Sequence, residues 1–220
     1  MRSETSIEES LAGTLWPRRP AADAPAEASQ SRSHFVRDAA LCLAAVGILT
    51  LSAKISVPFL PVPITLQSLA VLCLGAAYGV RLSVISIVAY LVCGISGLPV
   101  FANTPPFLAG PAYLLGPTGG FLIGFIPAAA LMGLIAEAKL DRSFFAALPC
   151  AFIAVALIFL CGFLWLAFWA KIGTNGHGIG TAAAWAKGVA PFLLGDALKA
   201  ALTAALLPAT WSLITPRPQG

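Results

Sequence analysis

Long apolar runs, separated by short breaks rich in proline, glycine or charge, are the main pattern along this sequence. A helix needs about 20 predominantly apolar residues to span a bilayer. Six segments approach or exceed that length: 37–57, 64–80, 82–101, 117–137, 143–170 and 187–213. The fifth and sixth are longer than a bilayer is thick, so part of each is expected to be tilted or interfacial. The pattern predicts an all-α, polytopic membrane protein with six transmembrane helices.

The two ends of the chain lack such runs. Residues 1–35 are polar and rich in alanine, serine and proline, and they contain no apolar core of the kind found in a signal peptide. Such a segment cannot bury enough apolar surface to fold by itself. We therefore expect a disordered cytoplasmic tail at 1–35, a six-helix membrane domain at 36–214 and a short solvated tail at 215–220.

Composition excludes a soluble protein. Of the 220 residues, 59% are hydrophobic and only 10% are charged, whereas soluble domains have about 25% charged residues. In water, so much exposed apolar surface would lead to aggregation. The apolar excess therefore has to face lipid.

Basic residues predict which ends of the helices are cytoplasmic. If the N-terminus is inside, the cytoplasmic side carries Arg2, Arg18, Arg19, Arg32, Arg37, Arg81, Lys139, Arg142 and Arg217. The opposite side carries Lys54, Lys171 and Lys187. This bias agrees with the positive-inside rule and predicts that both termini are cytoplasmic. The net charge of +4 then reflects topology, and no nucleic-acid partner is expected.

The residues needed for catalysis or cofactor binding are not arranged in any recognisable motif. The five cysteines fall inside the expected spans without the spacing of a metal site, and the two histidines lie in a tail and a loop. There is no phosphate-binding G-x-x-x-x-G-K-[ST] loop and no nucleophile set. We expect no catalytic residue, no metal, no cofactor and no ATPase activity in this chain.

Asp196 and Lys199 are the only charges that the expected topology places well inside a helix. A charge at the bilayer centre costs about 2.5–3.5 kcal/mol even on lenient scales, so such residues face the protein interior and usually serve function. Their i, i+3 spacing puts them on one helix face. They could form a structural ion pair, or they could offer an acceptor and a donor to a bound polar ligand such as a urea or an amide.

Three further polar residues fall towards the outer side in the same topology. Gln67 begins the second span, and Asn103 and Tyr113 lie in the loop between the third and fourth spans. A pocket near the outer leaflet, covered by the 56–63 and 102–116 loops, would bring them together with the charged pair.

Four blocks of sequence carry a family resemblance: 62–71 (VPITLQSLAV), 97–101 (GLPVF), 113–120 (YLLGPTGG) and 191–199 (PFLLGDALK). In this order they resemble the BioY family, the biotin-specific substrate-binding (S) subunits of energy-coupling factor (ECF) transporters. The resemblance covers residues 37–213. It implies a six-helix S-component with a biotin site open to the outside, working in the cytoplasmic (inner) membrane as a transport protein and not as an enzyme.

By motif position, the resemblance implies that the substrate-binding residues are Gln67, Asn103, Tyr113, Asp196 and Lys199. Asp196 would accept a ureido N–H, and Lys199 would donate to the ureido oxygen or to the carboxylate of biotin. Asn103 would supplement either contact. Gln67 and Tyr113 would serve the valerate carboxylate near the mouth of the site.

The resemblance also implies partners, namely a transmembrane coupling (T) subunit and two cytoplasmic ATPase subunits. This agrees with the missing phosphate loop. In such proteins a small-residue stripe on the first helix docks the coupling subunit, and Ala40 and Ala44 match that pattern. Three alternatives stay open: uptake by this protein alone, an S-component for another small vitamin, and, least favoured, an intramembrane enzyme or a purely structural protein.

Overall fold

The computed structural model describes residues 11–15, 27–104, 109–172 and 176–214. In this part of the chain the fold is mostly helical, with two small antiparallel hairpins. The long helices are α3 (Glu27–Lys54), α4 (Gln67–Ile95), α6 (Gly119–Glu137), α7 (Phe144–Phe168) and α9 (Leu193–Ile214). The short elements are α2 (Leu11–Leu15), β1 (Ser56–Val57), β2 (Ile64–Thr65), α5 (Pro111–Leu115), η2 (Leu140–Arg142), β3 (Lys171–Ile172), β4 (Gly176–His177), α8 (Thr181–Gly188) and η3 (Ala190–Phe192).

Five segments of the described chain are long and apolar enough to cross a membrane, where the sequence predicts six. They are His34–Lys54, Gln67–Ile95, Gly119–Glu137, Phe144–Phe168 and Thr181–Ile214. The difference arises in α4, which contains most of both expected spans, 64–80 and 82–101.

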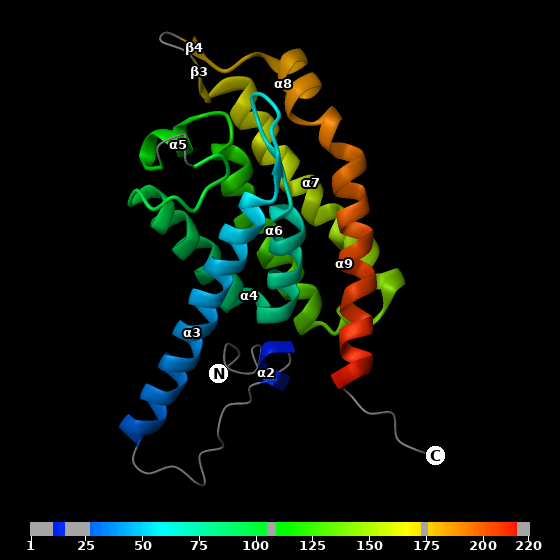
Figure 1. Ribbon diagram of the computed structural model, residues 1–220. Coiled ribbons are helices and arrows are strands. Elements are labelled where there is room, and N and C mark those ends of the chain that lie inside the picture. Colours follow the sequence, from blue (N-terminus) through cyan, green and yellow to red (C-terminus); the bar gives the residue numbers. More distant parts are fainter. Residues whose placement is uncertain (1–10, 16–26, 105–108, 173–175, 215–220) are drawn as a thin grey trace.

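A break at Gly79 divides α4 into two halves. Gly79 has φ 72° and ψ 175°, a conformation that side-chain-bearing residues rarely adopt. Figure 1 shows the chain changing direction here, so that the two halves diverge. The Glu137 carboxylate at the end of α6 accepts the Val80 N–H at 2.9 Å, which satisfies a free donor at the start of the second half. Gly133 makes room for this contact, because a Cβ there would lie 2.5 Å from the Val80 nitrogen.

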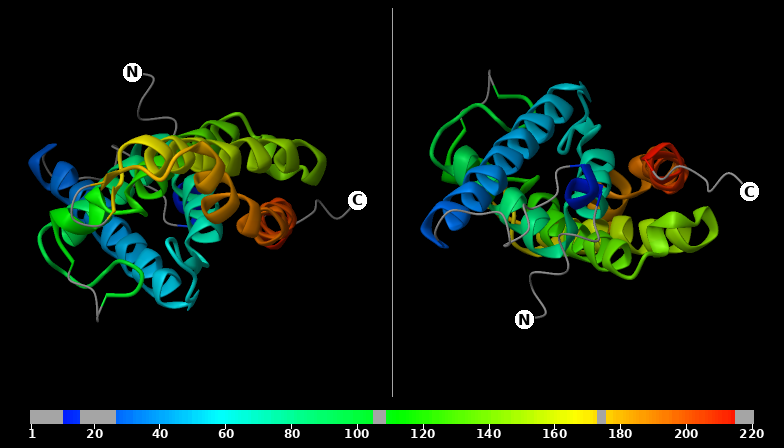
Figure 2. Two further views of the ribbon diagram at one scale, coloured as in Figure 1. Left: turned by 90° about the horizontal axis from the view of Figure 1, so that it is seen from above. Right: turned by 90° about the horizontal axis from the view of Figure 1, so that it is seen from below.

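The core is built on α4, α6 and α7, which pack side by side, with α9 against α7 and α4. Small residues allow the close approach of α6 and α7: a Cβ on Gly120 would lie 2.1 Å from Trp165 Cβ, and one on Gly124 would lie 2.9 Å from Ile158 Cα. The remaining long helix, α3, packs mainly on α4 and lies at the edge of the bundle (Figure 2).

The connecting elements gather at the two ends of the bundle. At one end lie the β1–β2 hairpin, α5, the β3–β4 hairpin and α8, and at the other lie the Gly79 break, η2 and the end of α9 (Figure 1). Lys171 is in β3 and Lys187 in α8, at the hairpin end. Lys139 and Arg142 belong to the η2 turn, and Arg81 directly follows Val80, which contacts Glu137 just before that turn. These five basic residues lie at opposite ends of the bundle in the same grouping that the sequence analysis used.

Part of the expected tail 1–35 is helical. Helix α3 begins at Glu27, and Leu11–Leu15 form α2, which packs against α4. Leu11 and Ala12 are buried, and Arg37 Nη2 donates a hydrogen bond to the Ala12 carbonyl at 3.2 Å. Residues 1–10, 16–26 and 215–220 lie outside the described residues.

Candidate ligand-binding site

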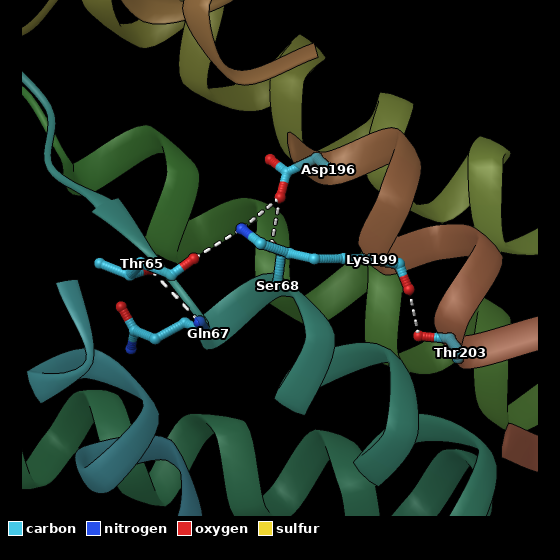
Figure 3. A network of polar contacts seen from close by, with 6 residues as sticks. All are labelled: Thr65, Gln67, Ser68, Asp196, Lys199 and Thr203. Atoms are coloured by element: carbon cyan, nitrogen blue, oxygen red, sulfur yellow. Dashed lines mark hydrogen bonds and ion pairs between the residues drawn. The ribbon is translucent and has the colours of Figure 1, made fainter. Parts of the chain in front are cut away.

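Asp196 and Lys199 lie in the first turns of α9 and face the beginning of α4. Lys199 Nζ is 2.7 Å from Asp196 Oδ1, and the Asp196 residue is only 6% exposed. Two other groups complete the cluster (Figure 3). Ser68 donates to Asp196 Oδ1 at 2.6 Å, and Lys199 Nζ donates to the Thr65 carbonyl at 2.6 Å and to Ser68 Oγ at 3.1 Å.

This cluster leaves one acceptor for a ligand. The three donors of the Lys199 ammonium all have partners. Within the described part of the chain, both hydrogen bonds to the Asp196 carboxylate go to Oδ1. Oδ2 is therefore the oxygen that can accept an N–H from a bound molecule.

The chain geometry around residue 66 explains why Gln67 and Ser68 reach this cluster. The β2 strand ends at Thr65 and α4 begins at Gln67, whose N–H donates to Thr65 Oγ1 at 3.3 Å. Gln67 and Ser68 thus occupy the first turn of α4. The starts of α4 and α9 meet, and both bring polar side chains into an otherwise apolar core.

A second polar chain orients Gln67. Its Nε2 donates to the Tyr90 hydroxyl at 2.8 Å, and that hydroxyl donates to the Val100 carbonyl at 3.1 Å. Gln67 is 3% exposed and Tyr90 is fully buried. Because its side-chain amide is held in this way, Gln67 forms a fixed part of the wall of the site.

Tyr113 on α5 is held by its ring and by its hydroxyl. The ring stacks on Phe101 with 4.8 Å between centroids and 20° between planes. The hydroxyl donates to the Ala102 carbonyl at 2.7 Å.

These groups surround one cavity of about 60 Å³, which has room for a few water molecules. Its polar wall is formed by Thr65, Gln67, Ser68, Tyr113, Thr118, Asp196 and Lys199, and its apolar wall by Val62, Pro63, Ala102, Phe121, Leu122, Phe125, Ile158, Phe159 and Phe192. A charged pair beside an apolar wall that contains four phenylalanines suits a small ligand with a polar head and an apolar body.

The family is decided by the match of residues 23–216 to the model described as the BioY family. The chain belongs to the BioY family. It is 35% identical to a probable biotin transporter BioY of Pyrococcus horikoshii over 71% of this chain and 85% of that protein. It is 34% identical to the biotin transporter BioY of Rhizobium etli over 76% of this chain and 87% of that protein.

A solved structure shares the fold. It is a crystal structure described as the S-component for biotin from an ECF-type ABC transporter, with a TM-score of 0.63 and 25% sequence identity. The likeness covers 84% of this chain and 94% of the other. The BioY chain described here therefore has the S-component architecture.

Asn103 does not line the same cavity as Gln67, Tyr113, Asp196 and Lys199. It lies in an adjoining groove of about 370 Å³, between the 59–63 and 112–118 segments. Asn103 has φ 55°, in a left-handed turn that Thr104 closes by donating to the Phe101 carbonyl at 2.6 Å. The groove and the cavity share Pro63, Tyr113 and Thr118.

The sequence prediction missed two polar groups of this BioY site that contact the charged pair. Ser68 contacts both charged residues, and its position directly after Gln67 in an apolar run was the available signal. Thr65 contributes its backbone carbonyl, which leaves no trace in the sequence. Clusters of three or more metal-ligating side chains are absent from the described residues.

Proposed function

We propose that this BioY protein is the biotin-capturing S-component of an ECF-type ABC importer and takes biotin up through the cytoplasmic (inner) membrane. The observation that carries the proposal is the Lys199–Asp196 pair, joined by Ser68, at one wall of an aromatic cavity. Membership of a family whose relatives are named biotin transporters supports the same ligand. The protein is a transport protein and not an enzyme.

The chemistry of biotin suits this cavity. Its ureido ring has two N–H donors and one carbonyl acceptor, its sulfur ring is apolar, and its valerate chain ends in a carboxylate. Asp196 Oδ2 accepts a ureido N–H, and Lys199 donates to the ureido oxygen or to the carboxylate after exchanging one of its present acceptors. The rings of Phe121, Phe159 and Phe192 cover the apolar part.

Gln67 and Tyr113 serve the valerate carboxylate, for which the Tyr113 hydroxyl gives up its bond to the Ala102 carbonyl. Asn103, in the adjoining groove, supplements the contact of Asp196 or that of Lys199. A cavity with room for only a few waters is smaller than biotin. Binding therefore requires the 56–65 hairpin to move apart from the segments 100–104 and 109–118. All three are outside the long packed helices, where such movement costs least.

In the proposed topology, α4 crosses the membrane twice, once on each side of Gly79, which gives six transmembrane helices. The η2 end, with Arg81, Lys139 and Arg142, and both termini are cytoplasmic. The hairpin end, where the cavity lies, faces the outside.

Coupling to transport requires partners, because this chain has no ATP-binding motif. The proposed partners are a transmembrane coupling (T) subunit and two ATPase subunits. Ala40 and Ala44 are exposed on α3, on a face that also exposes Gly47. A small-residue face of this kind allows another helix to approach closely. We assign it to the coupling subunit.

Calorimetric titration of the detergent-purified protein with biotin tests the ligand, with thiamine and riboflavin as comparison ligands. Tight, selective binding of biotin is expected, and selective binding of another vitamin would refute the ligand assignment. Uptake of labelled biotin by cells that make this protein with and without coupling and ATPase subunits tests the partners. Equal uptake in both would favour transport by the protein alone.

A further inference from the structure

Lys54, the last residue of α3, makes a set of hydrogen bonds that are not part of the proposed ligand site. Its Nζ donates to the Phe101 carbonyl at 2.8 Å, to Thr104 Oγ1 at 3.2 Å and to the Thr104 carbonyl. An ammonium has three donors, so all of them have an acceptor here. All three acceptors are uncharged and belong to one short turn, which lies 47 to 50 residues further along the chain.

The turn that Lys54 holds forms part of the wall of the cavity. Ala102, between the two acceptor residues, lines the cavity and accepts the hydroxyl of Tyr113 at 2.7 Å. Phe101 is fully buried and stacks on Tyr113. Its ring also meets Tyr90 edge-on, with 5.5 Å between centroids. Tyr90 in turn holds Gln67.

Each of these contacts depends on the path of the backbone at 100–104. The carbonyls of Val100 and Ala102 fix the two tyrosine hydroxyls, while those of Phe101 and Thr104 converge on Lys54. The convergence follows from the left-handed conformation of Asn103. Because hydrogen bonds from a charged donor are stronger than neutral ones, the ammonium is well suited to holding carbonyls that otherwise repel one another.

We propose that Lys54 is a positioning residue for ligand binding: it fixes the 100–104 turn, and through it Tyr90, Gln67 and Tyr113, without touching the ligand. The inference rests on the proposed biotin site. When this contact is lost, the turn leaves its place more often and the cavity opens more readily, so bound biotin dissociates faster.

The test compares Lys54→Met, which keeps the length of the side chain but removes its donors, with Lys54→Arg, which keeps donors. Lys187→Met, at the same end of the bundle, is the matched control. Biotin affinity and dissociation rate are measured on the purified full chain, together with hydrogen exchange of the amides at 100–104. Lys54→Met is expected to weaken binding about tenfold, equivalent to about 1.4 kcal/mol.

Most of this loss should appear as faster dissociation, with faster hydrogen exchange at 100–104. Lys54→Arg should restore much of the affinity, and Lys187→Met should behave as the parent. Parental affinity and dissociation rate in Lys54→Met would overturn the inference, and so would a lower melting temperature without a change in binding. Failure of the proposed function looks different, because the parent protein itself would then not bind biotin.

Discussion

Ser68 on α4 donates a 2.6 Å hydrogen bond to Asp196 on α9, across 128 positions of sequence. Its oxygen also accepts from Lys199 at 3.1 Å. One hydroxyl therefore joins the starts of two helices and sets which oxygen of Asp196 is left for a ligand. The charged pair alone would not have this defined geometry.

Replacing this hydroxyl tests its role. Ser68→Ala is expected to weaken biotin binding about tenfold and to lower the melting temperature, because hydrogen bonds to charged groups contribute about 1.5–3 kcal/mol. Titration calorimetry and thermal unfolding in detergent measure the two effects. Ser86→Ala is the matched control on α4, since Ser86 is also buried and its Oγ has no hydrogen-bond partner among the described residues. An equal loss in both variants would contradict a specific role for Ser68.

The topology can be tested by cysteine labelling of intact cells. With the five native cysteines replaced, a single cysteine at exposed Ser143, beside η2, should be protected from a membrane-impermeant maleimide. A cysteine at exposed Thr181, at the start of α8, should be labelled. Labelling after the cells are opened shows that both sites are reactive. The reverse pattern in intact cells would invert the proposed orientation.

The spans were predictable because they depend on composition, whereas helix continuity depends on local geometry. The expected spans 117–137 and 143–170 correspond closely to α6 and α7. The break expected between the spans 64–80 and 82–101 is present at Gly79, but the chain is helical on both sides of this residue, so one element contains most of both expected spans. The expected span 187–213 begins at the last two residues of α8, passes through η3 with Pro191, and lies mostly in α9.

The site was predictable only as far as its residues are costly to bury. Asp196 and Lys199 stand out because a charge in an apolar helix needs an explanation. The Thr65 carbonyl is invisible in a sequence, and the position of Asn103 depends on a left-handed turn in an irregular loop. Hydrophobic periodicity describes helices and does not describe the path of such a loop.

Asp141 in η2 predicts a dependence of stability on pH. Its side chain is fully buried, and this burial raises the pKa of the carboxyl above its usual range, while the Trp211 indole N–H, 2.5 Å away, and Arg142 act in the opposite direction. Because the folded state holds the proton more tightly than the unfolded state, stability should fall as pH rises from the ordinary Asp pKa, about 3.9, through the raised pKa.

Thermal unfolding between about pH 4 and pH 7, the range that starts at the ordinary Asp value, measures this fall. Asp141→Asn should flatten the pH profile. Trp211→Phe removes the N–H that favours the charged form of Asp141. The fall in stability of this variant should therefore extend to higher pH than in the parent. Identical slopes in the parent and Asp141→Asn would assign the pH dependence to other groups.

The pair of Asp196 and Lys199 provides the sharpest test of the ligand site. Lys199→Ala should be strongly destabilising, because removing one member of a buried ion pair costs about 3–5 kcal/mol, partly through the stranded charge. Its loss of biotin binding would therefore be ambiguous. The double variant Asp196→Asn with Lys199→Met removes both charges and should recover most of the melting temperature.

The two roles of the pair predict different behaviour for this double variant. If the pair holds the ureido group, the folded double variant binds biotin only weakly, because the negatively charged acceptor and the ammonium donor are both gone. If the pair only fastens α9 to α4, the double variant binds nearly as well as the parent. Melting temperature and calorimetric affinity, measured on the same preparations, separate these outcomes. Near-parental affinity in a well-folded double variant would remove Asp196 and Lys199 from the site and leave the membrane fold unaffected.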